Sequence, residues 1–143
     1  MQRNHHASLA LATIAAMWAV TSTCALAAAD LSGQWVGNSG IDGSRAVSKT
    51  TLVLGAADAQ DSSLRLEDRS VCMLRQGKYS VDANGALSLS FGQASGSEAC
   101  ERLGRGTFIV REGASPRALQ FEATYPGPDG GQNVRRGALA RYP

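Results

Sequence analysis

Apolar and polar side chains alternate most clearly in two segments of the chain. In the first, Leu87, Leu89 and Phe91 alternate with small or polar residues, and in the second, apolar residues occupy every other position from Leu119 to Tyr125. A period of two places one set of side chains on each face of a β-strand. Each segment therefore predicts a strand with one face in a hydrophobic core and the other in water.

Weaker versions of this pattern recur along the chain, separated by segments rich in glycine, proline and polar residues. Successive segments lie roughly ten residues apart, a spacing typical of small barrels and sandwiches. We therefore predict an all-β fold, a small antiparallel up-and-down barrel or sandwich of about eight strands. The predicted strands are residues 33–37, 46–54, 64–67, 70–75, 78–81, 87–91, 107–112, 119–125 and 134–142.

Glycine, proline and polar residues mark the expected turns. Residues 38–44 and 55–62 have the composition of loops, and residues 126–131 cannot continue a sheet because they contain two prolines and three glycines. The strongest turn signal is Asn84-Gly85, since this pair accepts the positive φ angles of tight hairpin turns. We therefore predict a hairpin over residues 78–91.

Two further segments interrupt the strands. Gln76-Gly77 predicts a turn between the strands on either side of it. Between residues 92 and 104, Ser95 followed three residues later by Glu98 resembles a capping box, which indicates one helical turn ending at Gly104. An irregular loop is the alternative for this segment.

Residues 1–29 have the three parts of a secretory signal peptide. Arg3 precedes an apolar run over residues 7–20, and small alanines follow where signal peptidase cleaves. We expect cleavage just before Ala28 or Asp30. Removal of the signal leaves one β domain, residues 30–143, in the bacterial periplasm or outside the cell.

Two other interpretations of the N-terminal segment are weaker. A membrane anchor needs about 20 apolar residues to cross the hydrocarbon core, and this run is shorter. Cys24 suggests a lipoprotein, but Thr21 and Thr23 stand where a lipidation motif would have leucine and a small residue. We therefore expect no stable membrane anchor.

The mature chain has an unusual inventory of reactive side chains. Both histidines and Cys24 lie in the signal segment, so the mature protein has no histidine and keeps two cysteines, Cys72 and Cys100. In an exported chain two cysteines predict a disulfide, and closing a loop of this length contributes about 3 to 4 kcal/mol. Half of a zinc site is the alternative, but it would need two more nitrogen or sulfur ligands.

The charge balance of the mature chain excludes one class of partner. Removal of the signal takes away Arg3 and no acidic residue, leaving thirteen lysines and arginines against twelve acids. A net charge near zero offers no electrostatic reason to bind nucleic acid or an anionic membrane surface. We expect a monomer that does not bind nucleic acid.

Catalytic chemistry has few starting points in this chain. Without histidine, neither a Ser-His-Asp triad nor a Cys-His pair can form. The nearest carboxylate pairs are Glu98 with Glu101 and Asp58 with Asp61, but sequence neighbours in polar segments rarely face each other across a cleft, as glycoside cleavage requires. We therefore predict no catalytic residue, no metal site and no cofactor.

One short motif carries a resemblance to known proteins. Gly33-Gln34-Trp35 on the first strand, with an arginine on the last strand, resembles the calycin pattern of lipocalins, avidins and related small barrels. The resemblance implies that Trp35 packs near one end of a barrel and that a late arginine, Arg136 or Arg141, lies across it. Of the adjacent arginines Arg135 and Arg136, one faces the interior and can stack on Trp35 while the other meets solvent.

These observations favour a binding protein over an enzyme. We expect an exported, non-enzymatic module that recognises a periplasmic or extracellular protein through its loops, as small periplasmic barrels that inhibit proteases or lysozymes do. In this chain the cysteines lie later than in those inhibitors. Alternatives are a carrier of a small apolar ligand inside the barrel and a small Asp/Glu-dependent hydrolase or lyase. Trp35, Arg136 and Arg141 are the candidate binding residues.

Overall fold

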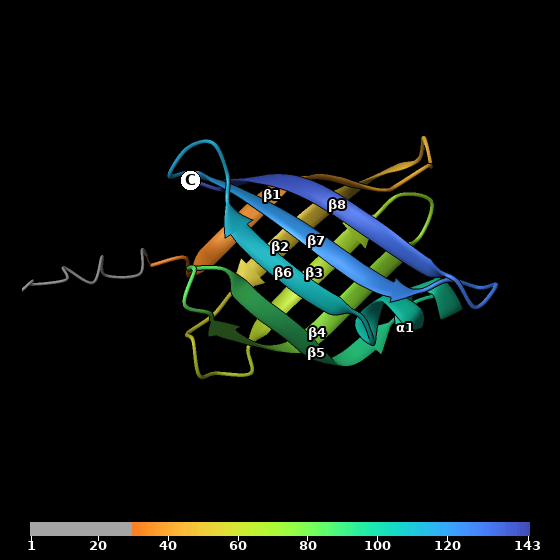
Figure 1. Cartoon of the computed structure of the whole chain (residues 1–143), viewed down its shortest axis with the longest axis horizontal. Coiled ribbons are helices and arrows are strands. Elements are labelled where there is room, and N and C mark those ends of the chain that lie inside the picture. The colour runs from red at the N-terminus through yellow and green to blue at the C-terminus, as the bar shows by residue number, and fades with distance from the viewer. Residues whose placement is uncertain (1–29) are drawn as a thin grey trace, which may run out of the picture.

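The computed structural model describes residues 30–143, and the predicted signal peptide lies outside this range. Eight strands and one short helix follow one another along the chain (Figure 1). Their bounds are β1 Gly33–Ile41, β2 Val47–Leu54, β3 Ser62–Glu67, β4 Val71–Val81, β5 Leu87–Ser95, α1 Glu98–Gly104, β6 Thr107–Glu112, β7 Ala118–Pro126 and β8 Gln132–Arg141. In residues 30–143 no helix has the length and apolar character needed to cross a membrane.

The eight strands form a closed antiparallel barrel, and this confirms the predicted fold class in its barrel form. Each strand pairs with the next one along the chain, and β8 returns to pair with β1. In this closing pair, Trp35 lies opposite Arg141 and Ile41 lies opposite Arg135. Closure gives every strand two neighbours, so no strand forms an edge of the sheet along its whole length.

An up-and-down barrel places alternate connections at opposite ends. The end that holds the start of β1, with connections 55–61, 82–86 and 113–117, is called the Trp35 end. The end that holds connections 42–46, 68–70, 96–106 and 127–131 is called the α1 end. In Figure 1 the Trp35 end is on the left, with the C-terminus, and the α1 end is on the right.

Side chains of alternate strand residues fill the barrel interior. The predicted inward series Leu87, Leu89 and Phe91 points inward, and the Phe91 ring meets the edge of the Phe108 ring with their centroids 5.0 Å apart. Every buried member of the hydrophobic cluster is at most 5 % exposed. The burial of these apolar side chains, worth about 25 cal/mol per Å² of surface removed from water, is the main favourable contribution to folding.

The predicted hairpin is confirmed, and its turn has a clear cause. β4 and β5 pair from Val81 and Leu87 outward, and Gly85 adopts a φ of 80°. The Asp82 carboxylate accepts hydrogen bonds from the backbone N–H groups of Asn84 and Ala86, which satisfies two donors inside the turn. The Asp-x-Asn-Gly sequence is therefore sufficient to define this turn locally.

One predicted loop was wrong in part and one predicted turn was wrong, because strands continue through them. Residues 42–44 of the predicted loop 38–44 lie in the β1–β2 connection, but residues 38–41 belong to β1, where 38–40 pair with both β2 and β8 and Ile41 pairs with β8. Gln76-Gly77 lies within the continuous strand β4, and Gln76 has a φ of 54° where the pairing of β3 with β4 shifts register. A β-bulge absorbs one extra residue without ending the strand, so the glycine signal there marks a bulge.

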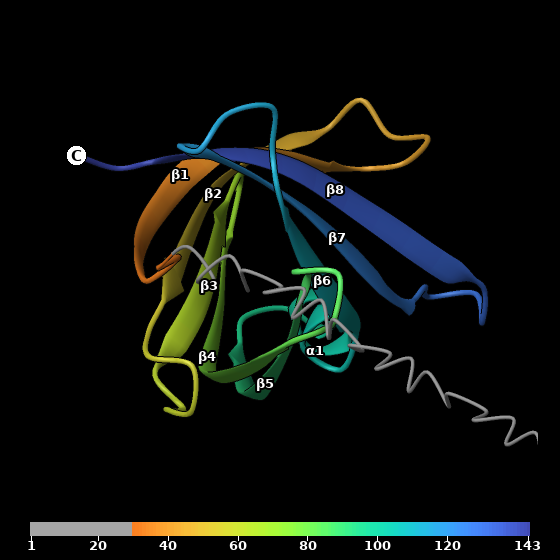
Figure 2. The same ribbon diagram turned by 60° about the vertical axis from the view of Figure 1, so that its left-hand side comes forward.

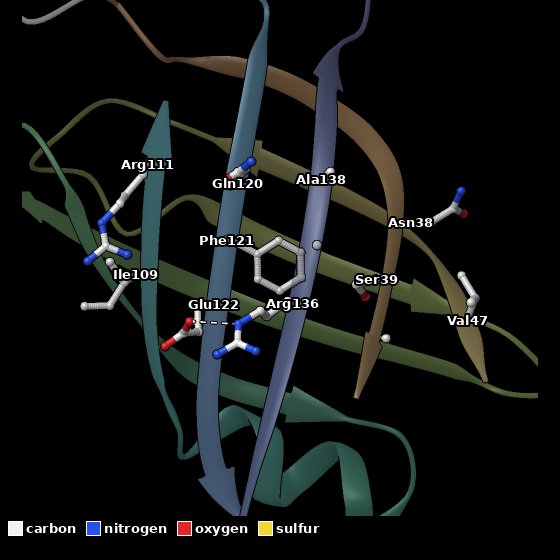
Figure 3. A pocket seen from close by; sticks show the side chains of 12 residues that line it. Asn38, Ser39, Val47, Ile109, Arg111, Gln120, Phe121, Glu122, Arg136 and Ala138 are labelled. Atoms are coloured by element: carbon white, nitrogen blue, oxygen red, sulfur yellow. Dashed lines mark hydrogen bonds and ion pairs between the residues drawn. The ribbon is translucent and has the colours of Figure 1, made fainter. Parts of the chain in front are cut away.

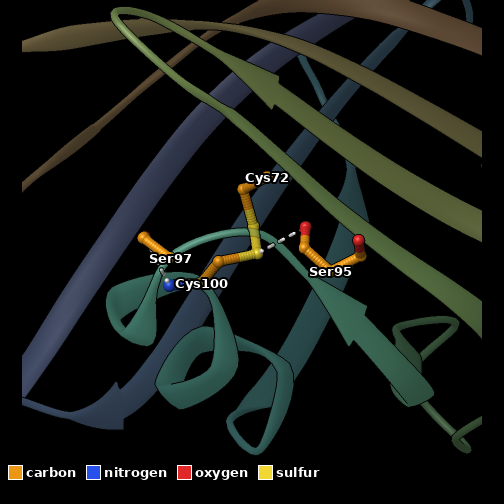
Figure 4. The surroundings of a disulfide bond; sticks show 4 residues. All are labelled: Cys72, Ser95, Ser97 and Cys100. Atoms are coloured by element: carbon orange, nitrogen blue, oxygen red, sulfur yellow. Dashed lines mark hydrogen bonds between the residues drawn. A yellow bond between two sulfur atoms is a disulfide. The ribbon is translucent and has the colours of Figure 1, made fainter.

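Of the two structures considered for residues 92–104, a helical turn and an irregular loop, the helix is present as α1, but its N-cap differs from the predicted one. The N-cap is Ser97, whose hydroxyl accepts a hydrogen bond from the Cys100 N–H at 3.3 Å, so the capping box predicted at Ser95 is wrong. The predicted disulfide is confirmed: Cys100 on α1 is bonded to Cys72 on β4, with Cα atoms 5.4 Å apart (Figure 4). The disulfide fixes α1 to the barrel wall.

Helix α1 lies beside the weakest seam of the barrel. The β5–β6 pair has three residue pairs in register, from Leu87–Val110 to Leu89–Phe108, whereas β5 continues to Ser95 along β4. Beyond Leu89 the two strands diverge, and α1 lies next to them at this end of the barrel (Figure 2). Leu103 of α1 is 3 % exposed and belongs to the core cluster. The helix therefore completes the core where the sheet pairing stops.

Candidate functional site

Trp35 occupies the centre of the Trp35 end and is completely buried. Its indole Nε1 donates a hydrogen bond to the Leu31 carbonyl oxygen at 2.9 Å. The guanidinium carbon of Arg141 lies 4.9 Å from the centroid of the indole ring, a cation–π contact. Arg141 Nη2 also donates to the carbonyl oxygens of Asp30 and Ser32, at 2.9 and 2.7 Å. Residues 30–32 are thus held across the end of the barrel by two side chains.

The structure separates the two arginines that were candidates for contact with Trp35. Arg141 lies beside Trp35, whereas Arg136 points outward and forms ion pairs with Asp42 and Glu122. The stacking proposed for Arg135 or Arg136 is wrong. Arg135 does face the interior, but it lies opposite Ile41 at the α1 end, far from Trp35 along β1.

A large recess opens at the Trp35 end, beside residues 30–32. Its volume is about 1190 Å³. Four separate segments form its wall: residues 30–32, the β2–β3 connection, the β4–β5 hairpin and the end of β6. The lining residues are Asp30, Leu31, Ser32, Gly55, Ala56, Ala57, Tyr79, Val81, Asp82, Asn84, Gly85, Ala86, Leu87, Arg111 and Glu112. Known small-molecule sites occupy about 300 to 1,000 Å³, so the recess is large enough for a ligand or a partner side chain.

Tyr79 lies in the wall of this recess, close to three acidic side chains. The Tyr79 hydroxyl donates a hydrogen bond to the Gly55 carbonyl oxygen at 2.8 Å, which fixes the side chain against the β2–β3 connection. Burial raises the pKa of the Tyr79 phenol, and the negative charges of Asp30, Asp61 and Asp58 raise it further. Three acidic side chains therefore lie close enough to Tyr79 to act on its phenol.

A second, smaller hollow lies on the outer surface of the barrel. This outer groove has a volume of about 520 Å³ and runs over β1, β8, β7 and β6 (Figure 3). The ion pair between Arg136 and Glu122 stands in it, with Ile109 and Arg111 on one side and Val47 on the other. Of its three charged groups, Arg136 and Glu122 are paired with each other, whereas no ion pair to Arg111 is present among residues 30–143.

A buried polar cluster lies inside the barrel at the α1 end. Arg135 is 9 % exposed, and its Nη1 donates hydrogen bonds to the hydroxyls of Ser39 and Ser48 at 3.0 and 3.3 Å. The Thr50 hydroxyl donates to the Ser39 hydroxyl, and the Ser48 hydroxyl donates to the Asp68 carboxylate. Arg135 Nε is buried and has no hydrogen-bond partner among residues 30–143.

Neither carboxylate pair considered from the sequence spans a cleft. Glu98 and Glu101 lie on the first turn of α1, where Glu98 pairs with Arg102 at 3.5 Å. Asp58 and Asp61 both lie in the β2–β3 connection. Over residues 30–143 no group of three or more histidine, cysteine or acidic side chains is placed to hold a metal ion.

Sequence reasoning missed Tyr79 and the hydroxyl partners of Arg135. Tyr79 belongs to the predicted hairpin, but its contact with Gly55 joins residues 24 positions apart. Arg135 had one available signal: it shares strand parity with Leu139, which predicts an inward side chain. Nothing in the strand pattern predicts hydroxyl partners 87 and 96 residues away.

The chain was compared with protein-family models, with curated proteins and with solved structures, and none of the three comparisons found a match.

Proposed function

We propose that this protein is an exported binding module, without enzymatic activity, that recognises a protein partner through the Trp35 end of its barrel. The observation that carries this proposal is the location of free space. The interior is filled by side chains of the hydrophobic cluster, while the recess of about 1190 Å³ lies at the end, among the loops. Loops on a rigid scaffold are where such folds place recognition.

The architecture supports recognition by a preorganised surface. The β4–β5 turn is held by the Asp82 carboxylate, the β2–β3 connection is held by the Tyr79 hydroxyl, and residues 30–32 are held by Trp35 and Arg141. Loops that are already ordered lose little conformational entropy when they bind. The Trp35 end therefore presents a rigid, concave surface built from four chain segments.

The test compares bulky, uncharged substitutions at the two ends of the barrel. Ala57 is exposed and lines the recess, and Ala99 is exposed on α1 at the opposite end. The exported, disulfide-bonded protein and its Ala57→Tyr and Ala99→Tyr variants serve as bait in periplasmic extract, and captured proteins are quantified by mass spectrometry. We expect a stoichiometric partner that binds the parent and Ala99→Tyr but is lost with Ala57→Tyr. Loss with Ala99→Tyr alone would move recognition to the α1 end and overturn the assignment.

A carrier of a small apolar ligand is the second candidate. The observation in its favour is that Leu31, Val81 and Leu87 give the recess an apolar part, and its volume exceeds what such ligands need. A hydrophobic fluorescent probe tests this candidate on the native protein. Saturable binding of one probe per chain, displaced by a fatty acid and blocked by Ala57→Tyr, would replace protein recognition with ligand transport.

A further inference from the structure

We propose that the recess at the Trp35 end receives a basic side chain, lysine or arginine, of the protein partner. This inference rests on the proposed function, because it names the chemistry of the partner at the same recess. The recess is a cavity large enough for a side chain of the partner, and the acidic residues around it favour a side chain with a positive charge.

The first step is the sign of the charge. Asp30, Asp82 and Glu112 line the recess, and Asp58 and Asp61 lie close enough to act on Tyr79. Three arginines at this end oppose these five acids: Arg111 at the edge of the recess, Arg117 in the β6–β7 connection, and Arg141, which donates to the carbonyl oxygens of Asp30 and Ser32. The cleavage expected before Ala28 or Asp30 adds one α-amino charge near Asp30. The excess is negative, and a partly enclosed site with walls of low dielectric constant strengthens its attraction for a cation.

The second step is the direction of the charged side chains at the end of β6. Phe108 and Val110 point into the core, so Glu112 continues the inward series at the mouth of the recess. Arg111 has the opposite parity and also lines the outer groove. Among residues 30–143 no hydrogen bond or ion pair involves the Glu112 carboxylate, which leaves it free to accept one from an incoming cation.

The third step is the match between the lining and an amphipathic side chain. Lysine and arginine combine a stem of methylene groups with a charged head. The apolar residues Leu31, Val81 and Leu87 suit the stem, and the surrounding carboxylates suit the head. Tyr79 adds an aromatic ring that is fixed by its hydrogen bond to Gly55, and aromatic rings attract cations by about 0.5 to 1 kcal/mol at exposed sites. A purely apolar ligand would leave these carboxylates without a partner.

The test uses two peptide probes that differ by one charge. The isotope-labelled, exported protein is titrated by NMR with acetyl-Gly-Lys-Gly-amide and with the same peptide carrying norleucine, which keeps the stem and lacks the ammonium group. We expect saturable shifts of the backbone amides of residues 30–32, 55–57 and 79–87 with the lysine peptide. Its affinity should exceed that of the norleucine peptide by about tenfold and decrease as salt is added, since salt screens charge.

Variants identify the carboxylates that take part. Glu112→Gln should weaken binding of the lysine peptide about two- to fivefold, the range for a partly exposed ion pair, and leave the norleucine peptide unaffected. Glu101→Gln, which removes an exposed acid of α1 at the other end, is the matched control and should change neither. Thermal unfolding of each variant confirms that the fold is intact.

The outcomes separate this inference from the proposed function. Equal affinity for the two peptides, or lysine shifts that map outside the recess, would overturn the basic side chain as occupant. If Ala57→Tyr nevertheless abolished capture of a protein partner, recognition at the Trp35 end would stand with different chemistry. If the lysine peptide bound as expected but Ala57→Tyr left capture unchanged, the recess would be a cation site separate from the partner surface.

Discussion

Arg135 and Arg141 lie on the same inward side of β8, but at opposite ends of the barrel. Arg141 remains exposed, covers the indole ring of Trp35 and donates to two backbone carbonyls. Arg135 is 9 % exposed and donates to the hydroxyls of Ser39 and Ser48. Within residues 30–143 neither arginine forms a direct ion pair with an acid.

The difference shows how access to water decides what an arginine does in a barrel. Arg141 keeps its charge hydrated while its guanidinium packs on the Trp35 ring. It therefore stabilises this end by packing against the indole and shielding it from water. Arg135 has lost most of its hydration, and hydroxyl groups replace only part of it because Nε has no partner. We therefore expect the Trp35 end to depend on packing, and the interior of the α1 end to depend on a polar network.

Trp35→Ala tests the packing side of this comparison and should have the largest effect. Removing a completely buried tryptophan leaves a cavity beneath Arg141, and we expect a loss of about 3 to 5 kcal/mol in the free energy of unfolding. Urea denaturation followed by circular dichroism measures it. Val36→Ala, at the neighbouring half-buried position, is the control and should cost much less. A loss below about 1 kcal/mol for Trp35→Ala, smaller than any large core truncation, would contradict dependence on packing.

Arg135→Ala and Arg135→Met together test the polar network. Truncation to alanine removes two hydrogen bonds from a charged donor and the packing of the stem, so we expect a loss of about 2 kcal/mol. Methionine keeps much of the stem volume but removes the same two hydrogen bonds, so most of this loss, about 1.5 kcal/mol, should remain. A loss below about 0.5 kcal/mol for Arg135→Met would mean that the stem, rather than the hydrogen bonds, dominates, and would contradict dependence on the polar network. Urea denaturation at neutral pH provides both values.

Arg141→Ala should have a smaller effect on stability and a clear effect on fluorescence. Loss of one exposed cation–π contact and two hydrogen bonds to backbone carbonyls is expected to cost about 1 kcal/mol. Trp35 is the only tryptophan after residue 29, so its emission reports directly on this end. We expect a shift of the emission to longer wavelength in Arg141→Ala and no shift in Arg136→Ala. A shift in Arg136→Ala of the same size would contradict the placement of the two arginines.

Asp68 adds a small, pH-dependent contribution at the α1 end. The backbone N–H of Ser70 holds the pKa of Asp68 below its ordinary value of 3.8, and the Arg69 N–H, the Ser48 hydroxyl and the charge of Arg135 lower it further. A lowered pKa in the folded state stabilises the protein above the unfolded pKa, and this stabilisation is lost as the pH falls through the folded pKa. Asp68→Asn should therefore lower the urea midpoint at about pH 6 and lose that effect as the pH falls below 3.8 and through the folded pKa.

The control for this pH dependence is Asp129→Asn. Asp129 is an exposed acid of the β7–β8 turn, at the same end of the barrel, and no side-chain hydrogen bond to it is present in residues 30–143. Its substitution should leave the urea midpoint unchanged at both pH values. A constant difference between the parent protein and Asp68→Asn across the whole range would show that the carboxylate has a steric role instead.

The sequence alone determined the features that depend on neighbouring residues. The alternation from Leu87 to Phe91 and the Asn84-Gly85 turn predicted the β4–β5 hairpin, because strand parity and positive φ are local properties. The two cysteines among residues 30–143 left one possible pairing, Cys72 with Cys100. Local signals were less reliable at residues 38–41 and 76–77, where glycine and polar residues occur within strands whose partners supply the missing hydrogen bonds.

Only the tertiary structure decided the positions of the candidate site residues. Parity places Arg141 and Leu139 on one face of β8 and Arg136 on the other, but it does not say which end of the barrel each residue reaches. That depends on the register of β8 against β1, which joins residues about 100 positions apart and places Arg141 opposite Trp35. The recess likewise combines four segments that barrel closure brings together. Such contacts follow from the packing of the whole sheet, and no local pattern in the chain encodes them.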